Sequence, residues 1–356
     1  MTPAVVAAKR GAMEMQANVR LGRIATVTSL LWAALLAPTD AHAWGCAGHQ
    51  TVALIAQSQL SSAARAKADS LLKDNPIRMT MTKQGQPLKL RRLCPSPLGA
   101  FVDASTWPDD IRAKENKPFD KWHSADWHFL DIPRGAARDR VPTFCPNDGC
   151  VTQAIRDQVA ILQSDASNRK KADALRFLIH FVGDIHQPLH CTTNSDRGGN
   201  CVPVKYLDRQ GHLEAGKLHA AWDTNMIEAD PVYPGVPKLK GFATALTTEF
   251  QAQIPTWKSA GAKIDAMQAT AEDWAWDSHQ LAESTAYGKL PTQIPVEPER
   301  GQLASCVVNG EDISKRMAQF HEQLEQPYES AADPVIHEQL TKAGIRLALI
   351  LNAIWQ

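Results

Sequence analysis

Apolar residues recur every three or four positions along most of the chain, which is the spacing of amphipathic helices. This pattern predicts helices over residues 52–60, 61–72, 151–162, 172–184, 264–286 and 334–355. Strict alternation of apolar and polar residues is rare, and its best example predicts a strand over residues 202–207. Loops rich in proline and glycine separate these elements at residues 75–99, 132–150, 191–216 and 231–240. Because no change in composition marks a domain boundary, we predict one mostly helical domain with long loops and at most a small β-hairpin.

The first 43 residues have the pattern of a secretory signal peptide. Basic residues precede an apolar run over residues 24–38, which is shorter than the roughly 20 residues of a membrane span. Ala41 and Ala43 then form a small-x-small cleavage site, and an uncleaved anchor is the alternative. Cleavage after Ala43 would leave a single domain, residues 44–356, that begins at Trp44. We therefore expect an exported protein, periplasmic or secreted, that does not bind a membrane after processing.

Composition and charge fit an ordinary globular protein. The 356 residues include 38 basic and 38 acidic side chains, and 44% of residues are apolar. A formal net charge of zero argues against binding nucleic acid through a broad basic surface, because that mode needs clustered lysine and arginine. Any polyanionic ligand would have to be attracted locally.

The cysteines are compatible with an oxidising compartment. Cys145 and Cys150 bracket a turn-forming spacer, and Cys191 and Cys201 bracket a glycine-rich loop, so these are the two preferred disulfide pairs. Seven is an odd number, which leaves at least one thiol without a partner in the chain. A thiolate zinc site is disfavoured because no Cys-x-x-Cys motif occurs. The seven cysteines are Cys46, Cys94, Cys145, Cys150, Cys191, Cys201 and Cys306.

Histidine and aspartate occur in pairs at helical spacing. His180 and Asp184 are four residues apart on a predicted helix, so both side chains can face one cation. His219 and Asp223 repeat this spacing, and His190 lies close to the first pair in sequence. A single pair of this kind is more often a salt bridge. Two pairs with a further histidine favour a metal site.

Three other segments supply candidate ligands. Asp109 and His128 lie among aromatic and apolar residues, where an unpaired charge would be costly and a cation would remove that cost. A satisfied core histidine is the alternative for His128. Cleavage before Trp44 would create an α-amino group. Its ordinary pKa of about 7.7–8.0 makes the neutral, metal-binding form of the amine readily available. That amine and the Trp44 carbonyl oxygen could chelate one ion near His49.

Seven short motifs occur in a specific order along the chain. They are WGCAGH at 44–49, WPD at 107–109, HFLD at 128–131, HFVGD at 180–184, PLH at 188–190, GGN at 198–200 and LHAAWD at 218–223. In these motifs and their order the sequence resembles the trinuclear-zinc type I nuclease family. The family comprises single-strand-specific nucleases and 3′-nucleotidases of fungi, plants and bacteria, and its helical fold is related to that of zinc phospholipase C.

The resemblance implies that nine residues hold three zinc ions. One ion would be held by Asp109, His128, His180 and Asp184. A second would be held by the Trp44 amine and carbonyl, His49 and the bridging Asp184, and a third by His190, His219 and Asp223. Asp109 and Asp184 would be catalytic, with Asp109 also orienting the attacking water. Three dications against three aspartates would leave a positive pocket in a nearly neutral protein.

The resemblance also implies endonucleolytic hydrolysis of single-stranded DNA and RNA to 5′-phosphorylated products, with 3′-nucleotidase activity and zinc-activated water as nucleophile. A base stacked on Phe129 and hydrogen-bonded to Asp131 would explain the preference for single strands, because a paired base cannot enter such a pocket. Asn200 and Asn225 would also line the pocket. The alternative is that Phe129 belongs to the core and that Asp131 is a helix-end charge.

Two other functions remain open at this point. One is a zinc phospholipase C or another phosphoesterase on the same metal frame, and the other is a non-catalytic periplasmic zinc-binding protein. The sequence indicates no stable protein partner, and we expect a monomer. The remaining histidines are expected to be structural or exposed, and they are His123, His186, His212, His279, His321 and His337.

Overall fold

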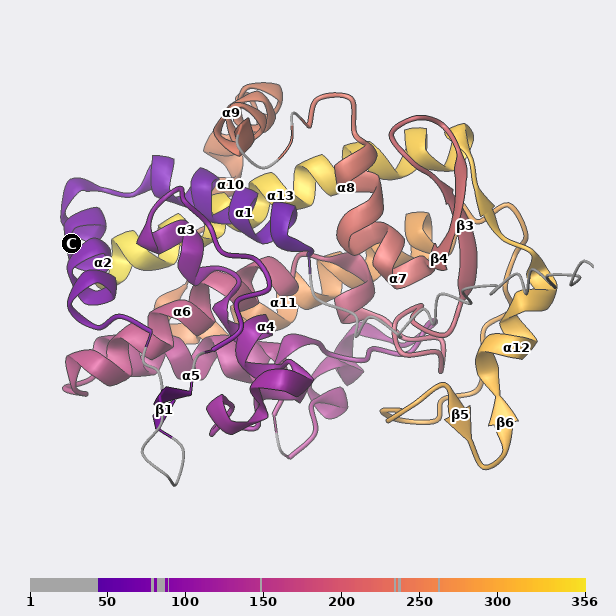
Figure 1. The fold of residues 1–356 in the computed structure, drawn as a ribbon, viewed down its shortest axis with the longest axis horizontal. Helices are drawn as coiled ribbons and strands as arrows, with labels where there is room; N and C mark the ends of the chain where they lie inside the picture. The colour runs from indigo at the N-terminus through magenta and orange to yellow at the C-terminus, as the bar shows by residue number, and fades with distance from the viewer. Residues whose placement is uncertain are drawn as a thin grey trace, which may run out of the picture. The chain divides into compact units, whose positions relative to one another are not determined.

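Helices connected by long loops form most of the protein, which confirms the predicted fold class (Figure 1). The computed structural model describes residues 44–356 apart from 78–79, 82–86, 89, 148, 234, 236–237 and 262. The predicted signal peptide lies outside the described residues. Within the described part of the chain, no helix is both long and apolar enough to span a membrane.

The longest helix, α13 (Gln326–Ile354), packs against α1 (Cys46–Gln59), the first helix of the described chain (Figure 1). Both bury apolar residues along the contact. Gly344 allows a close approach, since a Cβ there would lie 2.5 Å from Cγ2 of Ile55. The prediction placed the start of this helix at Pro334, but the helix continues through that proline to Gln326. The prediction began the helix at Pro334 because proline is more common in the first turn of a helix than in its interior. Here the proline lies in the interior, so that rule placed the start of the helix too late.

A second group of helices packs beside this pair. Helix α6 (Asn168–Asp184) contacts α5 (Val151–Gln163) and α13, and α5 also contacts α11 (Met267–Leu281). The hydroxyl of Ser167 caps α6 by accepting a hydrogen bond from the Lys170 amide. The predicted helix over 264–286 is observed as α11 flanked by a 3-10 turn, η7 (Ile264–Ala266), and a π-helical turn, η8 (Ala282–Ala286).

Shorter helices fill much of the remaining chain. Several of them lie between residues 100 and 144, where no helix was predicted, because five to seven residues are too few to display a helical repeat. The α-helices are α2 (Ser62–Asp74), α3 (Ala100–Ala104), α4 (Trp107–Arg112), α7 (Leu218–Ala220), α8 (Met226–Ala229), α9 (Leu239–Glu249), α10 (Ile254–Ala260) and α12 (Ile313–Met317). The 3-10 helices are η1 (Lys114–Phe119), η2 (Ser124–His128), η3 (Arg138–Phe144), η4 (Pro188–Cys191) and η9 (Ala318–Phe320), and η5 (Ala221–Asn225) is a π-helix.

The strands are short. The predicted strand is confirmed as β3 (Pro203–Leu207), which pairs antiparallel with β4 (Leu213–Lys217) in the register Lys205 to Ala215. β7 (Gln323–Leu324) adds to β3 in parallel. Two small hairpins lie elsewhere, β1 (Thr80–Met81) with β2 (Pro87–Leu88) and β5 (Val307–Val308) with β6 (Glu311–Asp312).

Three disulfides connect described residues: Cys46–Cys94, Cys145–Cys150 and Cys201–Cys306. The prediction of the Cys145–Cys150 pair is confirmed, and that of Cys191–Cys201 is wrong. The thiol of Cys191 is buried and donates to the Ile185 carbonyl at 3.4 Å, whereas Cys201 reaches Cys306 from the base of the β3–β4 hairpin. Burial raises the pKa of the Cys191 thiol well above its ordinary value, which makes that thiol unreactive.

Removal of the Cys201–Cys306 disulfide should lower the free energy of unfolding by about 4–5 kcal/mol, against about 2 kcal/mol for Cys145–Cys150. The difference arises because the sequence separations are 105 and 5 residues. Urea unfolding of the two double-serine variants measures both losses. Equal losses, or a Cys191–Cys201 peptide in a non-reducing digest, would contradict this disulfide assignment.

Candidate metal centre

Eight of the nine predicted ligand residues are histidines and aspartates, and the fold brings the side chains of all eight together. They come from elements far apart in sequence and are nearly all fully buried. Their positions are His49 on α1, Asp109 on α4, His128 at the end of η2, His180 and Asp184 on α6, His190 on η4, His219 on α7 and Asp223 on η5.

Asp109, His128 and His180 form the first group of side chains with the arrangement of a cation site. Nε2 of His180 lies 3.0 Å from Nδ1 of His128 and 3.7 Å from Oδ1 of Asp109. Nδ1 of His128 lies 3.8 Å from the same oxygen. Two ring nitrogens and a carboxylate oxygen therefore face one small volume.

Asp184 connects this group to His49. Its Oδ2 lies 3.0 Å from Nδ1 of His128 and 3.2 Å from Nε2 of His180, whereas Oδ1 lies 3.4 Å from Nε2 of His49. The two oxygens of one carboxylate thus face different histidines. Gly183 makes room for His49, since a Cβ at that position would lie 2.9 Å from Nδ1 of the His49 ring.

The third group consists of His190, His219 and Asp223. Nε2 of His219 lies 3.2 Å from Nε2 of His190 and 3.3 Å from Oδ2 of Asp223. The second His–Asp pair therefore lies beside His190, which is the grouping that the family resemblance implied. Asp223 lies on the π-helical turn η5, and turns of this kind occur frequently at functional sites.

Backbone carbonyls fix the orientation of three rings. Nδ1 of His180 donates to Ser105 O at 2.6 Å, and Nδ1 of His190 donates to His128 O at 2.7 Å. Nδ1 of His219 donates to Gly198 O at 2.6 Å. Each bond places the proton on Nδ1 and directs the lone pair of Nε2 into its group, as is usual for histidines that bind a metal ion.

Charge and burial indicate that these groups fit a cation. Among the described residues, Nε2 of His49, Oδ1 of Asp184 and Oδ2 of Asp223 are buried and have no hydrogen-bond partner. Burial raises the pKa of Asp184 to about 7 and that of Asp223 well above its ordinary value. A cation would offset the same cost by favouring the ionised carboxylates.

The histidines are already in the form that binds metals. Burial lowers the pKa of His180 to about 4 despite the opposing charge of Asp109, and it lowers the pKa of His219 to about 4 as well. It also lowers the pKa of His49, His128 and His190. The imidazoles are therefore neutral at pH 7 and can offer a lone pair.

Trp44 lies beside these groups. Its side chain is fully buried, and the next amide, that of Gly45, donates to Asp223 O at 2.6 Å. Gly45 permits this approach, since a Cβ there would lie 2.2 Å from Oγ1 of Thr224. The main chain next to Trp44 therefore reaches the segment that carries Asp223.

Two residues near the groups were not predicted. Arg112 follows Asp109 by one helical turn and donates from Nε to Oδ1 of Asp109 at 2.7 Å, which places a positive charge among three carboxylates. Gln187 donates to Oδ1 of Asp223 and so holds that carboxylate in place. The i, i+3 spacing of Asp109 and Arg112 is visible in the sequence, whereas the contact between Gln187 and Asp223 joins residues 36 positions apart and depends on the tertiary structure.

Phe129 and Asp131 line the same pocket, whose volume is about 240 Å³. Phe129 is half-buried and contributes to the pocket wall. Desolvation and the nearby charge of Asp196 raise the pKa of Asp131 to about 7. Asn200 and Asn225 are not among the lining residues, and the side chain of Asn200 instead donates to Arg197 O at 2.9 Å.

The six remaining histidines lie outside the three groups. His186 and His279 are buried and hydrogen-bonded, His186 to Val182 O and Arg346 and His279 to Thr192. His337 forms ion pairs with Asp230 and Glu249. The exposed ones are His123, His212 and His321.

A helical frame that buries three groups of imidazoles and carboxylates defines a protein with several candidate cation sites. The chain belongs to the S1/P1 nuclease family, whose model matches residues 44–356. It is therefore a nuclease, an enzyme that hydrolyses phosphodiester bonds.

The alignments with individual relatives cover two thirds or more of the chain. Nuclease S1 of Aspergillus oryzae is 27% identical over 326 residues, which cover 88% of this chain and 92% of the relative. Endonuclease 4 of Arabidopsis thaliana is 29% identical over 346 residues, 94% of each chain. Nuclease P1 of Penicillium citrinum is 29% identical over 252 residues, which cover 67% of this chain and 80% of the relative.

Replacement of Asp184 by asparagine should remove at least one bound metal ion and lower nuclease turnover by more than about 100-fold, because loss of a residue that only orients a metal ligand already costs about 10–100-fold. Metal analysis and an oligonucleotide cleavage assay measure the two effects. Asp173→Asn is the matched control, since Asp173 is a buried carboxylate on the same helix that pairs with Arg176. Full metal content and full turnover in Asp184→Asn would exclude a bridging role.

Proposed function

We propose that this nuclease is zinc-dependent, that it cleaves single-stranded DNA and RNA to 5′-phosphorylated products, and that it also acts as a 3′-nucleotidase. The observation that carries the proposal is the three groups of buried imidazole nitrogens and carboxylate oxygens that face one another. Among the described residues, Nε2 of His49, Oδ1 of Asp184 and Oδ2 of Asp223 have no hydrogen-bond partner there. Imidazole and carboxylate ligands together suit zinc.

In this proposal, nine residues hold three zinc ions. The two oxygens of Asp184 face different histidines, which supports a bridge between the first two sites. The short distance between His190 and His219 supports a separate third site. The ligands are Trp44 through its amine and carbonyl, His49, Asp109, His128, His180, Asp184, His190, His219 and Asp223.

When bound, zinc supplies Lewis-acid activation of water and of phosphoryl oxygens. Asp109 has a second role, in which its carboxylate accepts a hydrogen bond from the attacking water and orients it. The bond from Arg112 Nε holds that carboxylate in one orientation. The guanidinium also adds a fixed positive charge that attracts the substrate phosphate.

The pocket lined by Phe129 and Asp131 accounts for a preference for unpaired bases. A base that stacks on an aromatic ring gains about 1–3 kcal/mol, and a carboxylate beside the ring can accept a hydrogen bond from an exocyclic amine. A base in a duplex would have to unpair and unstack before it could reach these groups. The half-buried position of Phe129 in the pocket wall supports this role over a place in the core.

Export and processing complete the proposal. Signal peptidase would remove residues 1–43 and create the Trp44 amine in the periplasm or outside the cell. The family match begins at Trp44, and three disulfides suit an oxidising compartment, which support this step. The processed enzyme would act as a monomer.

One extra alanine before Trp44 should lower zinc content by one ion per chain and reduce kcat/KM by at least about 100-fold, because it moves the α-amino group away from His49 and Asp184. Metal analysis of the purified protein and cleavage of single-stranded DNA check this result. One alanine added after Gln356, which is exposed, provides the control. An unchanged zinc content and rate would refute ligation by the N-terminus.

Phe129→Ala should reduce kcat/KM for single-stranded oligonucleotides by about 5- to 150-fold, which corresponds to the loss of 1–3 kcal/mol of stacking. The zinc content should not change, since Phe129 is not a proposed ligand. Steady-state kinetics with metal analysis test both statements. Phe320→Ala serves as control, because Phe320 is half-buried but does not line the pocket. Equal kinetics for Phe129→Ala and the parent enzyme would indicate that Phe129 is a core residue and does not bind the base.

A further inference from the structure

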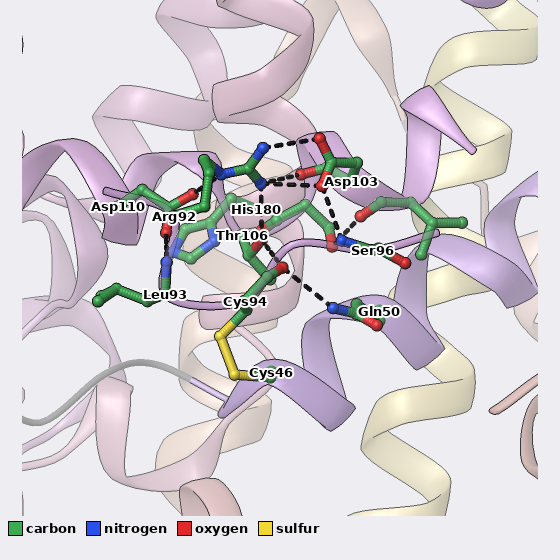
Figure 2. Close-up of a disulfide and its surroundings, with 12 residues drawn as sticks. Cys46, Gln50, Arg92, Leu93, Cys94, Ser96, Asp103, Thr106, Asp110 and His180 are labelled. Carbon is green, nitrogen blue, oxygen red and sulfur yellow. Dashed lines mark hydrogen bonds and ion pairs between the residues drawn. A yellow bond between two sulfur atoms is a disulfide. The ribbon is translucent and has the colours of Figure 1, made fainter. Parts of the chain in front are cut away.

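Residues 91–96, which we call the strap, lie between the start of α1 and the segment that carries α3 and α4 (Figure 2). The Cys46–Cys94 disulfide joins the strap to the first residue of α1, with a Cα–Cα distance of 5.5 Å. Cys46 stands two residues after Trp44 and three before His49. The disulfide is therefore attached within the segment that supplies two proposed zinc ligands.

The strap is anchored on its other side by a partly buried ion network. The Arg92 guanidinium pairs with Asp110 and makes two further bonds to the Asp103 carboxylate, at 2.7 and 3.0 Å. The same carboxylates accept strap amides, that of Leu93 at 2.6 Å and that of Ser96 at 2.8 Å. Asp110 is fully buried and follows Asp109 on α4, so this network fixes the strap against a ligand-bearing helix.

One strap carbonyl, that of Cys94, connects the neighbours of three proposed ligands (Figure 2). It accepts a hydrogen bond from Nε2 of Gln50 at 3.3 Å and another from Oγ1 of Thr106 at 3.0 Å. Gln50 follows His49 on α1. Thr106 immediately precedes α4, which carries Asp109, and it follows Ser105, the residue whose carbonyl orients His180.

The first turn of α1 needs such an anchor. Gly45 is its N-cap and provides no side-chain hydrogen bond to the free amides of the turn. Gly45 and Gly48 also give this segment a large backbone entropy. His49 belongs to this turn, so fraying at the helix start would move the ligand itself.

We propose that the Cys46–Cys94 disulfide and Arg92 are positioning residues that hold the segment from Trp44 to His49 against the part of the site that carries Asp109 and His180. None of the three is a ligand. The strap keeps the first turn of α1 folded before a metal ion binds, and thereby raises the affinity of the site that contains His49. The link to zinc affinity and turnover rests on the proposed function, whereas the link to folding of the first turn does not.

The test compares the mature enzyme with its Cys46→Ser/Cys94→Ser variant, and uses Cys145→Ser/Cys150→Ser as the matched control that removes a different disulfide. Hydrogen exchange of the metal-free proteins is measured on peptides that cover residues 44–54. The first variant should exchange its His49 and Gln50 amides at least about tenfold faster than the parent, with α13 unchanged. The control should match the parent.

Zinc binding is then measured by chelator competition. The Cys46→Ser/Cys94→Ser variant should bind one of its zinc ions at least about tenfold more weakly and show a matching loss of kcat at low free zinc. High free zinc should restore kcat, which a merely destabilised enzyme would not show. Unchanged exchange, or faster exchange with unchanged zinc affinity, would overturn the positioning role.

Arg92→Lys keeps both cysteines and provides a second variant if the double-serine protein does not fold. Lysine retains the charge but cannot bind two carboxylates in the same geometry, so exchange at His49 should increase by a smaller factor in the same direction. No change in Arg92→Lys would also overturn the proposal. A parent protein that binds no zinc would refute the proposed function, and the exchange data would still decide whether the strap holds the first turn.

Discussion

The burial of three carboxylates beside imidazole lone pairs is the constraint on which the rest of this structure depends. Asp109, Asp184 and Asp223 are buried, burial raises the pKa of Asp184 and of Asp223, and Arg112 places a positive charge beside Asp109. Such a cluster is unfavourable unless further positive charge compensates it. In the proposed function, bound zinc ions would supply this charge and leave a local positive excess that attracts a phosphodiester to a chain with no net charge.

The helical frame makes this arrangement rigid. Helix α6 contributes His180 and Asp184 from its last turn, where burial on several sides prevents the side chains from turning away. Glycines let other segments approach closely: Gly183 makes room for the ring of His49, and Gly45 lets the N-terminal segment bond to Asp223 O. The large apolar core thus offsets the free-energy cost of burying the carboxylates and imidazoles of the site. The stability of the core keeps these side chains in place.

Local parts of the site were predictable from the sequence, and non-local parts were not. Four-residue spacing placed His180 with Asp184 and His219 with Asp223, because that spacing alone puts both side chains on one helix face. The meeting of His49 with Asp184 depends on packing between α1 and α6, and only the order of the motifs suggested it.

Cys145 and Cys150 are close enough in sequence for a turn to pair them, whereas the partners of Cys201 and Cys46 are set by tertiary structure. Helices α3 and α4 were missed since so short a segment shows no repeat, and the Arg92 network was missed because its acids lie on those two helices.

Metal analysis of the mature protein, on a sample whose N-terminal residue has been sequenced, tests the central claim most directly. Native mass spectrometry gives both quantities for the same molecules. The account predicts a chain that starts at Trp44 and carries three zinc ions, with apparent affinity falling as pH drops and the imidazoles protonate. An active chain that starts at another residue, or one that carries fewer than three ions at saturating zinc, would contradict it.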